Sequence, residues 1–163
     1  MKNKEKQAQS LPKTNSLNFG CGRDIREGYD NIDKEDFDFN VFPYPIEDES
    51  YDYIYSRHVL EHLKYPEQVI DELVRICKKN GEIRIKVPHF NSEGAISTFG
   101  HISFFVPYSF TEYATRHPEI IILEIEEVPS IFGMFLFPNW LRNKLSKMLR
   151  GIFVKLNLRI RKC

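Results

Sequence analysis

The sequence Ser-Leu-Asn-Phe-Gly-Cys-Gly, at residues 16–22, decides the fold of this chain. Ser16, Leu17 and Phe19 predict a short buried strand. Gly20 and Gly22 predict a tight turn directly after it, because glycine adopts positive φ and lets the backbone approach a ligand closely. A strand that runs into a Gly-x-Gly turn is typical of open α/β sheets, which bind ligands at the carboxyl ends of their strands. Two glycines around a small residue are often no more than a turn, so the prediction depends on the residues after Gly22.

Strands and helices alternate along the rest of the chain. Further strands are predicted over 29–33, 37–42, 51–56, 82–87, 120–128 and 154–160, and helical periodicity begins at His58 and covers 67–79, 109–116 and 139–150. Asn80-Gly81 is a typical helix stop, and Ser109-Phe110-Thr111-Glu112 is a typical capping box. Seven strands interleaved with helices predict an α/β, Rossmann-like, doubly wound fold with a mostly parallel sheet.

Length and composition indicate one globular domain. The chain has 163 residues, and we expect a mobile tail over 1–15 and a single domain over 16–163, with a lid or acceptor region over 89–118. Its three cysteines lack metal-ligand spacing and their odd number argues against a disulfide framework, so a reducing, cytoplasmic location fits best. No signal peptide opens the chain, and its most apolar run, 131–141, is well short of the ~20 residues that a membrane helix needs.

Charge is unevenly distributed although the net charge is zero. Acids dominate residues 24–72, whereas the segment after Phe137 carries only basic charges. The basic helix over 139–150 is a candidate for peripheral contact with an anionic membrane, although a core helix with solvated Lys and Arg is the commoner arrangement. Nucleic-acid binding is not expected, because no aromatic platform accompanies these charges. Nothing in the sequence indicates an oligomeric state.

Short motifs between residues 16 and 110 carry a family resemblance. They are Leu17–Gly22, Gly28–Asp33, Asp38–Asn40, Pro43–Pro45, Glu49–Asp52, His58–His62 and Leu73–Gly81. In this order they resemble the class I S-adenosylmethionine-dependent methyltransferases, within a small group similar to methyltransferase type 11. The resemblance implies a seven-stranded sheet with an antiparallel last strand and S-adenosylmethionine as the cofactor. A short link between the first two strands, as here, is usual in that group.

The resemblance also implies a set of cofactor-binding residues. These are Gly20, Cys21, Gly22, Asp33, Asp38, Phe39, Ser56, Arg57 and His58. The glycine turn lines the methionine part, whose carboxylate its N–H groups hold as an anion nest. Asp33 accepts hydrogen bonds from the ribose hydroxyls, Asp38 lies near the adenine amine, and Phe39 is an apolar wall. The last three residues face the methionine end and the acceptor. Without the resemblance, an ordinary solvated loop acid is the better interpretation of Asp33.

Three histidines are candidate bases. Methyl transfer is an in-line displacement in which orientation supplies much of the acceleration, so a base is needed only where the acceptor must lose a proton. His58 and His89 follow predicted strands, and His101 lies in the lid region. We expect His101, followed by His58, to be catalytic.

A metal site is not predicted. His58, Glu61 and His62 share a helical face at i, i+3 and i+4, which is compatible with a metal. However, the metalloprotease order His-Glu-x-x-His is absent, and the resemblance requires no metal. Packing is the expected role of His62, and Glu61 is expected to orient a neighbour.

The acceptor class is inferred from a missing motif. The Asp/Asn-Pro-Pro-Tyr/Phe/Trp sequence that the resemblance associates with amino-group methylation is absent, and Pro88-His89-Phe90 follows the fifth strand instead. We therefore expect methyl transfer to oxygen on a small molecule, a sugar or a lipid-linked glycan. One alternative is a non-catalytic or partner-dependent module that binds S-adenosylmethionine. Another, a nicotinamide-binding protein, is disfavoured by the missing third glycine and by the short spacing to Asp33.

Overall fold

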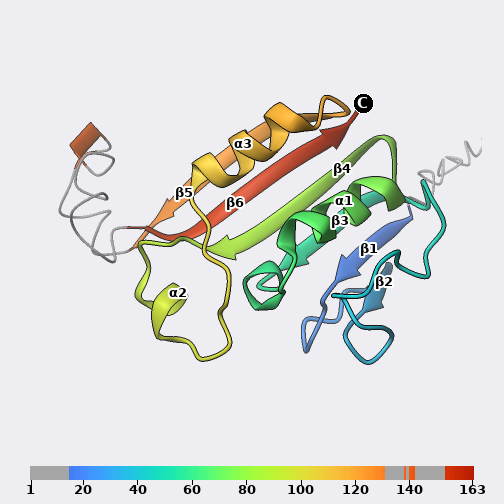
Figure 1. The fold of residues 1–163 in the computed structure, drawn as a ribbon, viewed down its shortest axis with the longest axis horizontal. Helices are drawn as coiled ribbons and strands as arrows, with labels where there is room; N and C mark the ends of the chain where they lie inside the picture. The colour runs from blue at the N-terminus through green and yellow to red at the C-terminus, as the bar shows by residue number, and fades with distance from the viewer. Residues whose placement is uncertain (1–14, 131–137, 139, 142–152) are drawn as a thin grey trace, which may run out of the picture.

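A computed structural model describes residues 15–130, 138, 140–141 and 153–163 of the chain. The strands are β1 (Ser16–Phe19), β2 (Tyr29–Ile32), β3 (Tyr51–Arg57), β4 (Cys77–Pro88), β5 (Ile120–Pro129) and β6 (Phe153–Lys162). The helices are η1 (Leu60–His62, a 3-10 turn), α1 (Pro66–Ile76), α2 (Glu93–Ser97) and α3 (Pro107–Arg116). Within the described residues the strands form one six-stranded sheet in the order β2-β1-β3-β4-β6-β5 (Figure 1).

The sheet is mostly parallel. β1 pairs in parallel with β2 and β3, and β3 pairs in parallel with β4, whereas β6 is antiparallel to both β4 and β5. The predicted α/β fold, mostly parallel sheet and antiparallel last strand are therefore confirmed. The sheet order places the glycine turn after β1 next to the ends of β2 and β3.

The predicted strand over 37–42 is wrong, and this is why six strands rather than seven are found among the described residues. Asp38 closes a turn instead: its side chain accepts the N–H of Asn40 at 2.9 Å, and its carbonyl accepts the N–H of Val41 at 3.1 Å. Alternating Phe and Asp residues suit a strand, but a side chain that bonds its own backbone competes with strand pairing.

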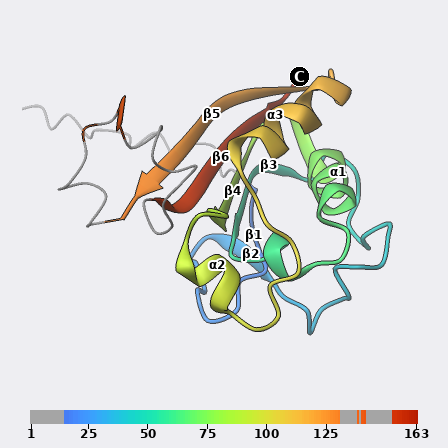
Figure 2. The ribbon, with the colours of Figure 1, turned by 60° about the vertical axis from the view of Figure 1, so that its left-hand side comes forward.

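The doubly wound arrangement is also not found among the described residues. α1 and α3 both lie on one face of the sheet (Figures 1 and 2). On that face, apolar residues of α1 pack with alternate residues of β4 in one hydrophobic core that includes Leu73, Ile76, Ile83 and Ile85. All four of these side chains are almost fully buried. This burial stabilises the platform from which the β3 and β4 ends project.

Several predicted helix boundaries are corrected. The helix predicted over 67–79 ends at Ile76, because Cys77 already pairs with Tyr51 as the first residue of β4. Asn80, at φ +63°, lies within the irregular start of that strand rather than at a helix end. The helix predicted from Ser109 starts at Pro107, and the Ser109 hydroxyl accepts the N–H of Val106.

Two predicted segments lie outside the described residues. One is the tail over 1–15, of which only Asn15 is described, and the other is the helix over 139–150, of which only Trp140 and Leu141 are described. Within the described part of the chain, no helix has the length and apolar character needed to cross a membrane.

Candidate functional site

The candidate site lies at the carboxyl ends of the four parallel strands. Gly20, Asp33, His58 and His89 directly follow β1, β2, β3 and β4. Because parallel strands end at the same edge of a sheet, these residues are brought together there. Figure 1 shows α2 beyond the arrowheads of β3 and β4, at this same edge.

Two asparagines hold the short link between β1 and β2. Asn18 and Asn31 face each other in the strand register, and the Asn18 amide donates to Asn31 Oδ1 at 2.8 Å. Asn18 also donates to the carbonyl of Asp24, and Asn31 Oδ1 accepts the N–H of Arg26. These bonds pair the carbonyl of Asp24 and the N–H of Arg26 in a link that contains no helix. The sequence alone did not indicate this structural role for either asparagine.

The glycine turn is tightly fitted against the residue after His58. Gly20 has φ +70°, and a Cβ placed there would lie 2.2 Å from Cγ2 of Val59. Only glycine avoids this clash. The predicted anion nest is not available in this arrangement, because Gly20 and Cys21 both donate their N–H groups to the carbonyl of Ile32, and Gly22 donates to Asp33 Oδ2. The turn therefore binds the end of β2 and positions Asp33.

A cavity of about 370 Å³ contains much of the predicted cofactor set. It is lined by Gly20, Gly22, Asp33, Lys34, Phe39, His58, Val59, His62 and Leu63. Phe39 is buried and stacks on Phe19 with ring centroids 4.1 Å apart, and the Tyr44 hydroxyl donates to its carbonyl. The cavity therefore combines one carboxylate with a rigid aromatic wall. Of the predicted residues, Cys21, Asp38, Ser56 and Arg57 do not line it.

A neighbouring cavity of about 260 Å³ is more polar. It is lined by Asn18, Gly20, Cys21, Gly22, Arg23, Asp24, Arg57 and His58. The predicted residues Cys21 and Arg57 are here, together with Asp24, which the sequence did not indicate. Arg57 Nη1 and Asp24 Oδ2 lie 3.9 Å apart, and both side chains are about half exposed. The cavity thus offers two cationic groups, Arg23 and Arg57, and one carboxylate, Asp24, whose Oδ2 also accepts from Arg26 at 3.0 Å.

A third cavity, of about 610 Å³, contains the histidines. It is lined by His58, Glu61, His62, Pro88, Ser92, Glu93, Gly94, Thr98, His101 and Ser130. The two predicted catalytic residues, His58 and His101, are therefore brought to one cavity. His58 lines all three cavities.

His58 is oriented by Glu61. Its Nδ1 lies 3.0 Å from Glu61 Oε1, and Glu61 is only 1% exposed. A carboxylate oxygen accepts, so Nδ1 carries a proton, and in the neutral imidazole Nε2 then presents a lone pair. His58 sits at φ +56°, in the left-handed region that His tolerates better than most residues. The expectation that Glu61 orients a neighbour is confirmed by this bond.

His89, the third candidate base, is a buried structural residue. Its Nδ1 accepts the N–H of Asn91 at 3.0 Å, and its Nε2 lies 3.0 Å from Glu127 of β5. Burial lowers the pKa of His89, although the neighbouring carboxylate of Glu127 opposes this shift. Since both ring nitrogens have partners, His89 is not positioned to take a proton from a substrate.

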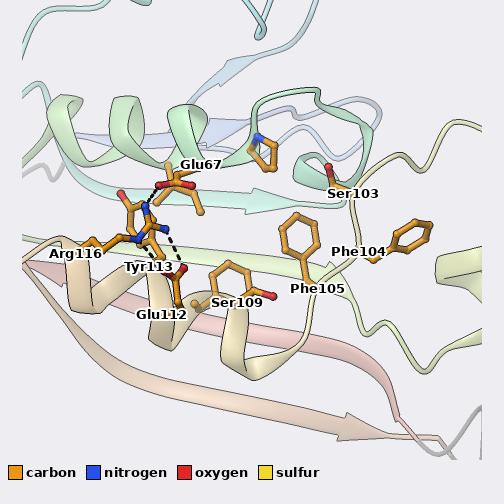
Figure 3. Close-up of a pocket in the computed structure, with 11 residues that line it drawn as sticks. Glu67, Ser103, Phe104, Phe105, Ser109, Glu112, Tyr113 and Arg116 are labelled. Atoms are coloured by element: carbon orange, nitrogen blue, oxygen red, sulfur yellow. Dashed lines mark hydrogen bonds and ion pairs between the residues drawn. The ribbon is translucent and has the colours of Figure 1, made fainter.

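A further cavity, of about 410 Å³, lies between α1 and α3 (Figure 3). Arg116 of α3 pairs there with Glu67 of α1 and with Glu112, and the ring of Phe105 faces the same space. Its three charged side chains pair with one another through Arg116, and no histidine is among the described residues that line it. We therefore do not assign it to the candidate site.

The family comparison gives a clear result for the middle of the chain. The family model described as "Methyltransferase domain" matches residues 26–85, which include Asp33, His58 and Glu61. Residues 26–85 are therefore similar to methyltransferase domains. The predicted resemblance is confirmed, and S-adenosylmethionine is the cofactor that this family implies. No curated protein matches the chain.

Solved structures confirm the fold at low sequence identity. A putative sarcosine dimethylglycine methyltransferase from Galdieria sulphuraria has a TM-score of 0.63 at 16% identity, over 92% of this chain and 78% of that one. A possible histamine N-methyltransferase from Thermotoga maritima has a TM-score of 0.56 at 15% identity, over 94% and 84%. The [4+2]-cyclase SpnF has a TM-score of 0.60 at 15% identity, over 91% and 74%. The fold is therefore that of class I methyltransferases, but it does not by itself determine the reaction.

Proposed function

We propose that this chain transfers a methyl group from S-adenosylmethionine to an oxygen of a small-molecule, sugar or lipid-linked acceptor. The observation that carries the proposal is the position of His58, which borders the two cavities beside the glycine turn and the larger histidine-lined cavity. A donor in the first two and an acceptor in the third meet at this side chain.

The residues around the glycine turn fit the cofactor. Asp33 is partly exposed at the end of β2, and each carboxylate oxygen accepts only one backbone N–H. It therefore keeps lone pairs for the two ribose hydroxyls. Phe39 supplies an apolar surface for the adenine. Arg57 and Asp24 suit the carboxylate and the ammonium group of the methionine part, a role that the amides of the glycine turn do not fill.

Methyl transfer to a hydroxyl requires a base that takes up the hydroxyl proton. When bound, the cofactor supplies a methyl group on a sulfonium sulfur, which is a good leaving group. Transfer of that methyl group to the acceptor oxygen would leave the electron pair of the broken carbon–sulfur bond on sulfur, and the acceptor oxygen would lose its proton. The hydroxyl proton passes to Nε2 of His58, which Glu61 holds in the required tautomer. A hydroxyl acceptor uses such a base, and this supports oxygen as the atom methylated.

The first test is calorimetric titration with S-adenosylmethionine and S-adenosylhomocysteine, with NADH as a control. We expect micromolar binding of the first two and none of NADH. Binding then justifies a screen of sugars and lipid-linked glycans for methyl transfer. A protein that binds NADH alone would contradict the proposal.

Asp33→Ala tests the cofactor position. We expect affinity for S-adenosylmethionine to fall about 10- to 100-fold, the equivalent of losing hydrogen bonds to a charged group. Glu35→Ala is the matched control, because Glu35 is an exposed acid two residues away that lines none of the three cavities. Unchanged affinity in Asp33→Ala would place the ribose elsewhere.

A further inference from the structure

Glu61, His62 and His101 form a cluster with the composition of a metal site. One ligand atom from each of these residues lies within 4.8 Å of the other two. The His62 and His101 rings meet edge to face with centroids 4.7 Å apart. This set differs from the group His58, Glu61 and His62 that the sequence spacing suggested. His101 replaces His58 and comes from a loop 39 residues after His62, whereas His58 is hydrogen-bonded to Glu61.

Both imidazoles are held with a lone pair available. His62 Nδ1 lies 3.1 Å from the carbonyl oxygen of Gly100, and His101 Nδ1 lies 3.0 Å from that of Ala95. A carbonyl only accepts, so each Nδ1 carries a proton, and in the neutral imidazole Nε2 is then the nitrogen with a free lone pair. Backbone carbonyls that bind the far ring nitrogen are a usual means of orienting histidine metal ligands.

Glu61 supplies the second, independent observation. Its Oε1 accepts from His58, whereas its Oε2 is buried and has no hydrogen-bond partner among the described residues. The residue is 1% exposed. A buried carboxylate oxygen without a partner is costly, and a bound cation removes that cost.

The backbone fixes the loop that carries His101 onto the turn that carries the other two residues. Ile102 and Ser103 both donate their N–H groups to the carbonyl of Glu61, at 2.8 and 3.2 Å, and the Ser103 hydroxyl donates to the carbonyl of Leu63. The three side chains are thus brought together by bonds that do not involve a metal. Ligands about 2 Å from an ion lie roughly 3 Å apart, so the cluster needs only a small contraction to close around one.

We propose that Glu61, His62 and His101 bind a divalent transition-metal ion. Two neutral imidazoles and one carboxylate suit Mn²⁺, Fe²⁺, Co²⁺ or Zn²⁺ and leave coordination positions open. All three residues line the 610 Å³ cavity, so the open positions face it. The role of the ion rests on the proposed function: the ion binds and polarises the acceptor oxygen. The preferred substrate class is therefore an oxygen-bearing acceptor that can chelate a metal. This replaces the prediction that no metal is used.

The test is titration of the full-length, EDTA-treated protein with CoCl₂, followed by calorimetry and by visible absorption of the bound ion. We expect one Co²⁺ per chain. His101→Ala and Glu61→Gln should each weaken binding about 100-fold or more, because each removes a ligand. Because His101 is a half-buried loop residue, His101→Ala is expected to fold. It therefore still tests the proposal if the variant at the buried residue, Glu61→Gln, does not fold.

His117→Ala is the matched control. His117 also lies beside two carboxylates, Asp71 and Glu119, but on the surface between α3 and β5 and outside the cluster. Its removal should leave Co²⁺ affinity unchanged. No Co²⁺ binding, equal binding in His101→Ala, or equal loss in His117→Ala would each overturn the proposal.

A parallel titration with S-adenosylmethionine separates this inference from the proposed function. Cofactor binding without Co²⁺ binding overturns the metal site alone. Co²⁺ binding without cofactor binding overturns the methyltransferase proposal and supports the metal site.

Discussion

The two sides of the candidate site meet at His58 but are constructed differently. The proposed cofactor side is formed mainly by residues at the ends of β1, β2 and β3, with Phe39 packed behind them. The acceptor side requires the segment after β4 to be placed on η1, which brings His101 to Glu61 and His62.

This difference separates two kinds of information. Contacts at adjacent strand ends are fixed by sheet order and by short local motifs. Contacts between η1 and the loop at 98–106 depend on backbone hydrogen bonds between distant segments, such as that from Ile102 to Glu61. Changes on one side are therefore expected to leave the other side intact.

His58→Asn gives the largest expected effect. Asn also tolerates positive φ, so the backbone at φ +56° is preserved while the imidazole is removed. We expect the rate of methyl transfer, measured as S-adenosylhomocysteine release with an acceptor from the screen, to fall about 10²- to 10⁴-fold. Affinity for S-adenosylmethionine should change little.

His101→Ala sharpens the same comparison. It should lower methyl transfer while sparing cofactor affinity, because His101 lines only the acceptor-side cavity among the three. Equal losses of turnover and cofactor affinity in either histidine variant would mean that the two sides are not separable.

Gly20→Ala tests the rigidity of the cofactor side. The new Cβ would lie 2.2 Å from Val59 Cγ2 at a backbone φ of +70°. We expect a loss of about 2–5 kcal/mol in the free energy of unfolding, measured with urea. Gly28→Ala is the control, because Gly28 has φ +79° but nothing within 4 Å of the added Cβ. Equal losses in the two variants would show that the contact with Val59 is unimportant.

The sequence predicted the cofactor side better than the acceptor side, for physical reasons. Alternating apolar residues and the glycine turn located β1, β3 and β4, and strand ends then placed Gly20, Asp33 and His58 together. The error at residues 37–42 arose because alternation does not reveal a side chain that bonds its own backbone, as Asp38 does.

On the acceptor side, spacing grouped His58 with Glu61 and His62 but gave no information about His101. A short-range pattern detects partners on one turn, whereas the partner across the loop is set by the bonds from Ile102 and Ser103 to Glu61. The donor tautomers at His62 and His101 depend on the carbonyls of Gly100 and Ala95, which no side-chain pattern encodes. Histidines after a strand end are therefore good candidates, but their roles require the structure.

The smallest expected effect is a pH dependence that distinguishes the two sides. His89 supports the acceptor side: it anchors the start of the segment over 89–106 through Glu127 and Asn91. Burial lowers the pKa of His89 below its usual value of 6.5. The unfolded chain therefore binds a proton more readily than the folded protein as the pH falls below about 6.5.

Neutral His89 therefore contributes to the free energy of unfolding. The contribution is complete above pH 6.5 and is lost as the pH falls through the lower folded-state pKa of His89. Glu72 of α1 is connected to the proposed cofactor side through Tyr44, whose N–H donates to Glu72 and whose hydroxyl donates to the Phe39 carbonyl. Burial opposes the lowering of the Glu72 pKa, but hydrogen bonds from Arg75 and from the Tyr44 N–H outweigh it. The contribution of ionised Glu72 to the free energy of unfolding is present above the ordinary Glu pKa of 4.5 and is lost only in more acidic solution. Urea unfolding between pH 8 and pH 3 should show a first decline that His89→Gln removes and a later one that Glu72→Gln removes. If His89→Gln leaves the first decline unchanged, the histidine is not held neutral by its contacts, and the acceptor side is anchored in another way.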